Sequence, residues 1–201
     1  MITGARAKGF KKLGLDSGAL IEGFKEIYDT VSDYDDLLDK IIEELDSENC
    51  LGITRGGNHF ISEATMRQIE FDGSRVRFVG DSVKDKVNPR IETTLLEFTI
   101  ENLRRVMPSS DVTTTGGKTV IRERTRIDAA DYMKSLTWVR ERSDGAFVLF
   151  TLFNPMNQSN ADVTGTDKSE GEMPVTFTAF NDDFKDMDYA PYELVIYEKT
   201  T

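Results

Sequence analysis

The chain has 201 residues, 38% of them hydrophobic, which is enough for one domain with a good core. Its 36 acidic residues outnumber 25 lysines and arginines, and the net charge of −11 argues against tight binding to nucleic acid phosphates. The single cysteine, Cys50, excludes an intramolecular disulfide, and no apolar run indicates a signal peptide or a membrane span, so we expect folding in a cytoplasm.

Residues 1–12 are basic in an otherwise acidic chain, with four cations at Arg6, Lys8, Lys11 and Lys12. They are either a frayed terminus or an arm that reaches an acidic neighbouring subunit. Residues 13–24 mix glycines with apolar residues and predict a loop or a short strand. We divide the chain into an N-terminal arm with a helix, 1–50, and a β domain, 51–201, within one structural domain.

The pattern over residues 32–46 predicts an amphipathic helix. Ser32 is the expected cap, paired with Asp35 in a capping box. Its apolar face is formed by Leu37, Leu38, Ile41, Ile42 and Leu45. Neighbouring acids such as Glu43 and Glu44 diverge on a helix, so we expect a solvated face and not a metal site.

The stretch 51–107 predicts a β-meander that ends in a helix. Asp72-Gly73 favours a tight hairpin between strands Met66–Phe71 and Arg75–Val79. Pro89 is compatible with the start of a strand but not its middle, so the next strand is expected over Ile91–Phe98.

Thr99 is the expected cap of the helix that follows, and Pro108 is expected to stop it. The apolar positions at helical spacing are Ile100, Leu103, Val106 and Met107.

Gly116-Gly117 predicts a hairpin turn between strands Asp111–Thr115 and Lys118–Ile127. Alternation along the second strand places Arg122, Arg124 and Arg126 on one face. Three arginines can bind phosphate, or they can pair with acids of an adjacent strand or subunit. The acidic composition favours the second interpretation.

A strong hairpin signal spans residues 134–155, with its turn at Ser143-Asp144-Gly145. The strand Phe147–Phe153 is apolar on both faces, which is unusual for an antiparallel strand with one face in water. Either a helix or second sheet covers its back, or another chain does. The candidate assembly residues are therefore Phe147, Leu149, Phe150 and Phe153, together with the three arginines.

A polar loop, 154–174, precedes closing strands expected over Val175–Phe180 and Glu193–Glu198. Asp162 and Asp167 in this loop lack the ligand spacing of an EF-hand, which favours a hairpin tip.

The sequence carries no positive case for an enzyme. His59 is the only histidine, and no nucleophile elbow, phosphate loop or partner cysteine for a metal occurs. We expect no catalytic residue, no cofactor and no metal. An enzyme would need carboxylates brought together only by folding.

Eight to ten short strands and two helices predict a mainly β (α+β) fold. The expected architecture is an antiparallel β-sandwich or half-open barrel with one or two flanking helices and an N-terminal arm. Such a sheet must protect its edges, and one solution is to continue into a neighbouring subunit until a ring closes.

The order and spacing of many short features from residue 51 onward resemble the tail tube protein of long-tailed bacteriophages. A second patch, Phe177–Asp182 followed by the strand Tyr192–Tyr197, resembles the end of the same family. The first 50 residues depart most from it. The features of the first patch are Leu51 to Gly57, Phe60, Glu63, Arg67, Ile69-Glu70, Asp72-Gly73, Gly80, Leu95 to Thr99, Leu103 and Pro108.

This resemblance implies hexameric rings whose inner strands join into one barrel, and rings that stack into a tube for genome DNA. It implies a virion tail assembled in the host bacterial cytoplasm, with the tail terminator, tape measure and distal tail proteins as further partners and no membrane. An electronegative lumen would let DNA slide without specific binding. We expect lumen residues at alternate positions of Gly57–Phe71 and Phe147–Phe153, and ring-stacking contacts from Met1–Phe24 and Asn157–Gly171.

Two alternatives stay open. The fold of tail tubes is shared by type VI secretion tubes and contractile tail tubes, so a contractile injection system is one. A monomeric β-sandwich binding module is the other, and it predicts one species at all concentrations with a ligand cleft.

Overall fold

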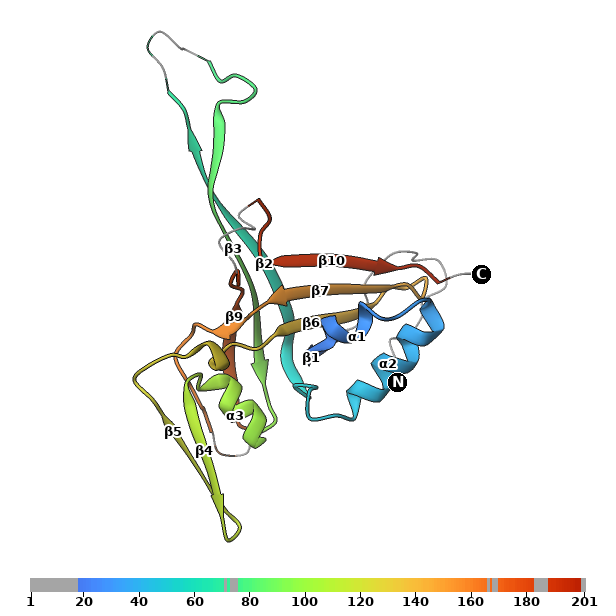
Figure 1. Cartoon of the computed structure of the whole chain (residues 1–201), viewed down its shortest axis with the longest axis vertical. Coiled ribbons are helices and arrows are strands. Elements are labelled where there is room, and N and C mark those ends of the chain that lie inside the picture. Colours follow the sequence, from blue (N-terminus) through green and yellow to red (C-terminus); the bar gives the residue numbers. More distant parts are fainter. Residues whose placement is uncertain are drawn as a thin grey trace.

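The computed structural model describes residues 18–70, 72, 76–165, 167, 170–182 and 188–199. Two four-stranded antiparallel sheets form the body of the molecule (Figure 1). The helix-covered sheet has the order β1-β6-β7-β10 and the arm sheet the order β2-β3-β9-β8. The fold is mainly β with a few helices, as the sequence predicts.

The helix-covered sheet consists of β1 (Ala19–Glu22), β6 (Ser135–Glu141), β7 (Phe147–Phe153) and β10 (Tyr192–Tyr197). The arm sheet consists of β2 (Thr54–Gln68), β3 (Ser82–Leu95), β9 (Met173–Thr178) and the short β8 (Met156–Asn157). A separate hairpin pairs β4 (Ser110–Thr115) with β5 (Lys118–Glu123). The helices are α1 (Phe24–Tyr28), α2 (Tyr34–Leu45), α3 (Ile100–Val106) and the 3-10 helix η1 (Ala129–Asp131).

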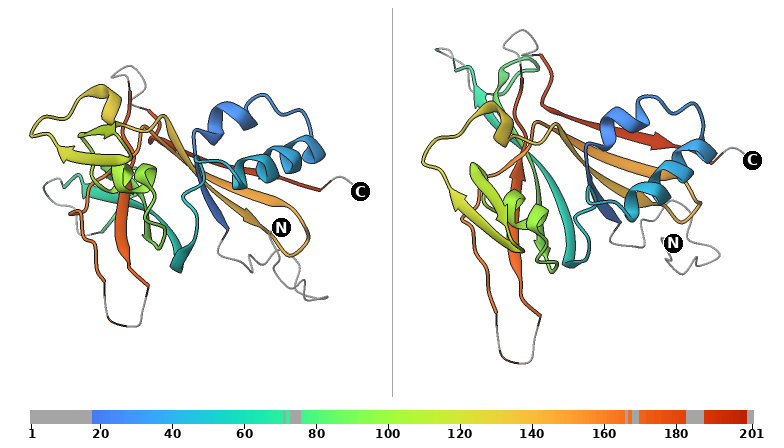
Figure 2. Two further views of the ribbon diagram at one scale, coloured as in Figure 1. Left: turned by 90° about the horizontal axis from the view of Figure 1, so that it is seen from below. Right: turned by 60° about the horizontal axis from the view of Figure 1, so that its bottom comes forward.

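Both apolar faces of β7 are covered within this chain. On one face, α1 and α2 pack over Phe147 and Leu149, and Figure 2 shows these helices on the side away from the arm sheet. On the other face, Leu152 packs with Ile91 and Phe177 of the arm sheet. The first of the two explanations predicted for this strand therefore applies: a helix layer and a second sheet enclose it.

Several locally coded elements are confirmed. Thr99 caps α3, since its side chain accepts a hydrogen bond from the backbone N–H of Asn102 at 3.1 Å. The turn between β4 and β5 lies at Gly116-Gly117, where φ is +59° and +79°. Two successive positive φ angles are the geometry of a tight primed hairpin turn, which glycine adopts without steric cost.

The predicted cap of α2 was wrong. The helix begins at Tyr34, and the cap is Asp33, whose carboxylate accepts a hydrogen bond from the backbone N–H of Asp36 at 3.0 Å. Asp33 and Ser32 are both suitable residue types, but Asp33 is the residue that directly precedes the helix in an extended conformation.

The expectation that Pro89 starts a strand was also wrong, because it lies in the middle of β3 opposite Ser62. Its carbonyl accepts a hydrogen bond from Ala179, just beyond the end of β9. The nitrogen and oxygen of one residue point to the same side of a strand, so the nitrogen of Pro89 faces β9 and not β2. The β2–β3 ladder therefore loses no hydrogen bond at the proline.

Two further strand boundaries differ from the prediction. Residues 76–79 are not a strand, and β2 pairs instead with β3 from Gln68 and Ser82 onward, while Gly73 of the expected turn lies outside the described residues. The strand predicted to run to Ile127 ends at Glu123. The terminal arm expected at residues 1–12 lies outside the described residues too.

Candidate assembly surface

The candidate surface for assembly is the free edge of the arm sheet. β2 is the outermost strand, and no strand among the described residues pairs with its outer side. It is 15 residues long, and a long edge strand of this kind is a template for pairing with another chain. Because Pro89 turns its nitrogen and oxygen away from β2, the opposite residue Ser62 must point its own N–H toward this free edge.

The outer face of the arm sheet is charged. Ile91 is packed in the core, so its neighbours Arg90 and Glu92 point to the outside, where Arg90 bonds Glu92 at 2.9 Å and Glu63 of β2 at 2.6 Å. These carboxylates raise the pKa of the Arg90 guanidinium. These ion pairs between β2 and β3 favour the observed register, and the outer face of the sheet stays exposed.

Arg55 makes the second group of ion pairs on this face. It bonds Glu170 at 2.5 Å and also Glu172, and the two carboxylates raise the pKa of its guanidinium. A hydrogen bond from its own backbone, together with Arg55, lowers the pKa of Glu170. In these ion pairs four carboxylates meet two arginines, and Lys86, opposite Thr65 on the same face, is a third cation, so the acids exceed the cations by one.

A shallow groove of about 530 Å³ runs over the same face. Its lining is mostly hydroxyl, amide and backbone groups. The residues are Arg55, Gly56, Gly57, Glu92, Thr93, Thr94, Ser159, Asn160, Asp162, Pro174, Val175 and Thr176.

Beyond the body, β2 and β3 continue as a two-stranded arm (Figure 1). Arg67 and Asp85 join the strands at 3.1 Å. Near the tip, the carboxylate of Asp81 accepts hydrogen bonds from the backbone N–H of Phe78 at 3.0 Å and from Gln68 at 3.1 Å. The bond from Phe78 contributes most to the lowered pKa of Asp81.

The three predicted arginines do not form one row. Because β5 ends early, Arg124 turns back to bond Asp111 at 3.2 Å and Asp128 and Asp131 at 2.5 Å each. Arg126 bonds Asp128 at 2.7 Å. Arg122 stays on β5, exposed and opposite Asp111 in the register. Two of the three cations are therefore matched by acids of the same chain.

The four apolar candidates also have partners within the chain. Phe147 and Leu149 are buried under α1 and α2. The ring of Phe150 lies 5.2 Å from those of Trp138 and Phe60, and Phe153 lies half-buried with the Lys25 ammonium 5.6 Å from its ring. Of the two regions expected to line a lumen, only the one in β2 reaches an outer sheet face.

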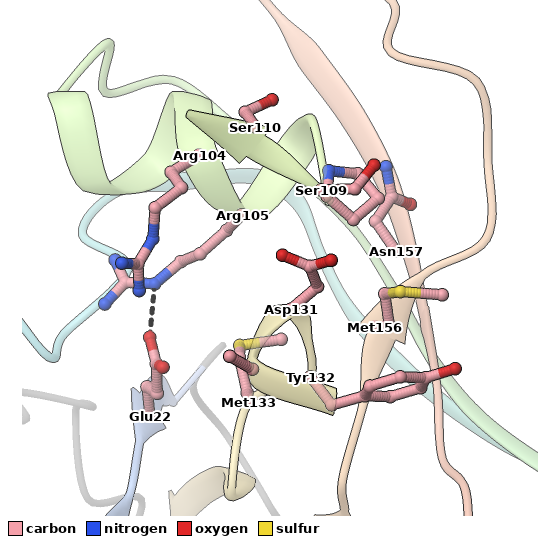
Figure 3. Close-up of a pocket in the computed structure, with 12 residues that line it drawn as sticks. Glu22, Arg104, Arg105, Ser109, Ser110, Asp131, Tyr132, Met133, Met156 and Asn157 are labelled. Carbon is pink, nitrogen blue, oxygen red and sulfur yellow. Dashed lines mark hydrogen bonds and ion pairs between the residues drawn. The ribbon is translucent and has the colours of Figure 1, made fainter. Parts of the chain in front are cut away.

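A small polar pocket of about 90 Å³ lies where α3, η1, β1 and β8 meet (Figure 3). The buried guanidinium of Arg105 bonds Glu22 at 2.6 Å, Asn102 at 2.9 Å and the carbonyl of Glu48 at 2.9 Å. Arg105 was not predicted from the sequence. Asn102 and Arg105 are three residues apart, so they are neighbours on one face of a helix, and this spacing could have indicated a polar contact.

The pocket does not have the geometry of a nucleophilic active site. The hydroxyl of Ser109 donates to the carbonyl of Arg124 at 3.3 Å, and that of Ser110 donates to the carbonyl of Met107 at 2.7 Å. Asp131 is bonded to Arg124. A catalytic hydroxyl needs a basic partner, and here both hydroxyls contact backbone oxygens.

Within the described ranges, no three acidic, histidine or cysteine side chains are grouped so that they could hold a metal ion. His59 is exposed, with its Nδ1 4.0 Å from Glu92. No helix in the described part of the chain combines the length and apolar character needed to cross a bilayer. No protein-family model matches the chain, and no curated protein matches it.

Proposed function

We propose that the protein is the tube subunit of a phage or phage-like tail. Its copies join edge to edge into hexameric rings, and the rings stack around a negative lumen through which DNA passes. The observation that carries this proposal is the 15-residue free edge of β2 in a sheet whose outer face is charged and uncovered. The resemblance from residue 51 onward supplies the ring and the tube.

A long unpaired strand tends to pair with other chains, and a repeated rotation that closes a ring leaves no edge exposed. β2 can make such a contact, because part of its backbone N–H and C=O groups point away from β3, toward the side where a second copy could pair. At the opposite margin of the arm sheet, the segment 156–159 already engages the outer edge of β9 at Thr176 and Thr178, so only the part of β9 near Pro174 lies beyond this cover.

A ring closed in this way has the arm sheet as its wall. The charged outer face is then the natural lumen, because the inner face is already buried against the helix-covered sheet. The small excess of carboxylates over cations on that face, together with the net charge of −11, would repel a passing DNA backbone and keep adhesion weak. Catalysis has no part in this function, and tail terminator, tape measure and distal tail proteins would contact the ends and lumen of the tube.

The groove on the outer face favours a second candidate, a monomeric binding module that holds a polar ligand there. Negative-stain electron microscopy of the purified protein over a range of concentration and salt separates the two. Rings or hollow tubes are the expected result. Compact monomers at every concentration would reject the tube and lead to a ligand search in the groove.

A further inference from the structure

One part of the helix-covered sheet stays exposed on the face that points toward the arm sheet. In the register of β7 and β10, Ile196 lies opposite Val148. Leu194 lies opposite Phe150, and directly opposite residues share a face of a sheet. Leu194 is 48% exposed and Ile196 46%, and neither belongs to the two buried apolar clusters. Val148 is half-buried. We call Val148, Leu194 and Ile196 the outer strip.

The outer strip continues the row of sites that the arm sheet covers. Leu152 of β7 packs with Ile91 of β3. Two residues back along β7, the ring of Phe150 lies 5.2 Å from that of Phe60 in β2, the outermost strand. Val148 is the next residue of β7 on this face. Figure 1 shows β6, β7 and β10 extending past β2 on the side away from β9. One further strand beside β2 would therefore lie over the outer strip.

Such a strand would follow the course of β2 across the helix-covered sheet. Just before β2, the backbone N–H of Leu51 donates to the carbonyl of Leu20 in β1. Further along, Phe60 lies 5.2 Å from Tyr192 in β10. β2 thus runs from β1 to β10, and a segment that runs from β10 to β1 would lie antiparallel to it.

The described chain begins on the face of the outer strip. Gly18 has φ +67°, and a Cβ atom there would lie 2.8 Å from the indole nitrogen of Trp138 and 3.0 Å from Cγ of Arg140. Only glycine allows so close an approach. Arg140 lies opposite Val148 in the register of β6 and β7, so the chain enters β1 on this face. The segment that precedes Gly18, residues 1–17, lies outside the described residues, and every other stretch outside them has five residues or fewer.

The length and the apolar pattern of residues 10–17 fit the outer strip. β1 and β10 are three strand positions apart, which is about 14 Å at a spacing of about 4.8 Å. Four or five extended residues, at about 3.4 Å each, span this distance. Counted back from Gly18, Leu15 then reaches β7 and Leu13 reaches β10. The two leucines share one face of an extended strand, which matches Val148 and Ile196.

Charge and tethering favour this segment over a second copy as the occupant. Residues 1–17 carry four cations and one acid, and the remaining residues carry a net −14. A second copy would instead bring its own net charge of −11 toward a chain of the same sign. A tethered segment also acts at a high effective concentration, so it outcompetes a free partner in dilute solution.

We propose that residues 10–17 dock on the outer strip of their own chain, beside β2, and close this edge until a second copy takes their place. The docking by itself is independent of the proposed function. The closing of the edge rests on that function and deepens it, because it names what keeps single subunits from joining early.

The first test detects the docking in dilute protein. In a Cys50→Ser background, one variant carries Leu13→Cys with Ile196→Cys. The control carries Leu13→Cys with Ile42→Cys, at an exposed position of α2 on the opposite face. After oxidation, intact mass and non-reducing electrophoresis should show a disulfide within one chain for the first variant only. Equal linkage in the control, no linkage to position 196, or linkage only between two chains would overturn the docking.

The second test measures the closing of the edge. Leu13→Asp with Leu15→Asp should release the segment, and Ala5→Asp with Ala7→Asp makes the same charge change outside residues 10–17. An edge that is closed in about nine of ten molecules pairs roughly tenfold more weakly. We therefore expect rings of the first variant, seen by electron microscopy, at a roughly tenfold lower concentration than rings of the control. An equal or higher concentration would overturn the closing of the edge.

The two tests separate this inference from the tube function. A disulfide within one chain, together with monomers of the unmodified protein and of both Asp variants at every concentration, would keep the docking and reject the tube. Rings of the unmodified protein without any disulfide to position 196 in the cysteine variant would keep the tube and reject the docking.

Discussion

Arg105 on α3 and Glu22 on β1 form a nearly enclosed ion pair, with Nε 2.6 Å from the carboxylate. The arginine side chain is 5% exposed, and its other two nitrogens bond Asn102 and the carbonyl of Glu48 (Figure 3). One guanidinium therefore joins α3, β1 and the segment after α2. Its planar array of donors is what allows three acceptors to be reached together.

Replacing Arg105 by Met is expected to lower the free energy of unfolding by about 3 kcal/mol, because it leaves Glu22 without its partner in a poorly solvated site. Arg105→Lys should recover little of this, since one ammonium cannot reach all three acceptors. Urea unfolding measures both. Arg104→Met is the matched control, since Arg104 is exposed on the next position of α3 and should change stability by less than about 0.5 kcal/mol. Equal effects at the two positions would contradict this account of the pair.

Ser62→Pro is expected to block ring formation and leave the monomer folded. The substitution removes an N–H that faces the free edge of β2, so the ladder to β3 keeps its hydrogen bonds while a neighbouring strand loses one. Ser62→Thr keeps the N–H and serves as the control. Sedimentation and electron microscopy report assembly, and circular dichroism reports the fold. Normal rings from Ser62→Pro would show that this edge is not the lateral contact.

Asp33→Ala is expected to destabilise the protein by about 1 kcal/mol, since the first turn of α2 loses the side chain that accepts the N–H of Asp36. Ser32→Ala should change the free energy of unfolding by less than about 0.5 kcal/mol. Thermal or urea unfolding of the two variants tests the assignment of the cap. The reverse order would restore Ser32 as the capping residue.

The turn between β6 and β7 should make stability depend on pH in the acid range. Arg142 bonds Asp144 at 2.7 Å and lowers the pKa of that carboxyl to about 2, from 3.8. The ionised form is favoured in the folded state, so this contribution is complete above about pH 4 and is lost as the pH falls toward 2.

We therefore expect Asp144→Asn to be less stable than wild type at pH 7, with a difference that shrinks between pH 4 and pH 2. Urea unfolding at pH 7, 4 and 2.5 measures this trend. A difference that stays constant over that range would show that the ionisation of Asp144 does not contribute.

The sequence by itself determined the elements whose signals are local. Thr99 with its following apolar positions specified α3, and Gly116-Gly117 specified the β4–β5 turn, because capping and positive φ depend on neighbouring residues alone. The same holds for the turn at 143–145 and for the closing strands, which the structure places within two residues of the prediction. The apolar pattern on both faces of β7 showed that both faces must be covered. It could not show which elements cover them.

Only the tertiary structure decided which surfaces are covered by contacts within the chain and which stay exposed. Phe147 and Leu149 are covered by α1 and α2, and Arg124 is drawn to three aspartates, because packing and ion pairing depend on residues that are distant in sequence. Pro89 is tolerated in β3 because β9 ends beside it. Which strand lies beside Pro89 depends on the order of strands in the sheet, and the residues around Pro89 do not indicate it. The candidate surface that remains is the β2 edge, with which no other strand among the described residues pairs.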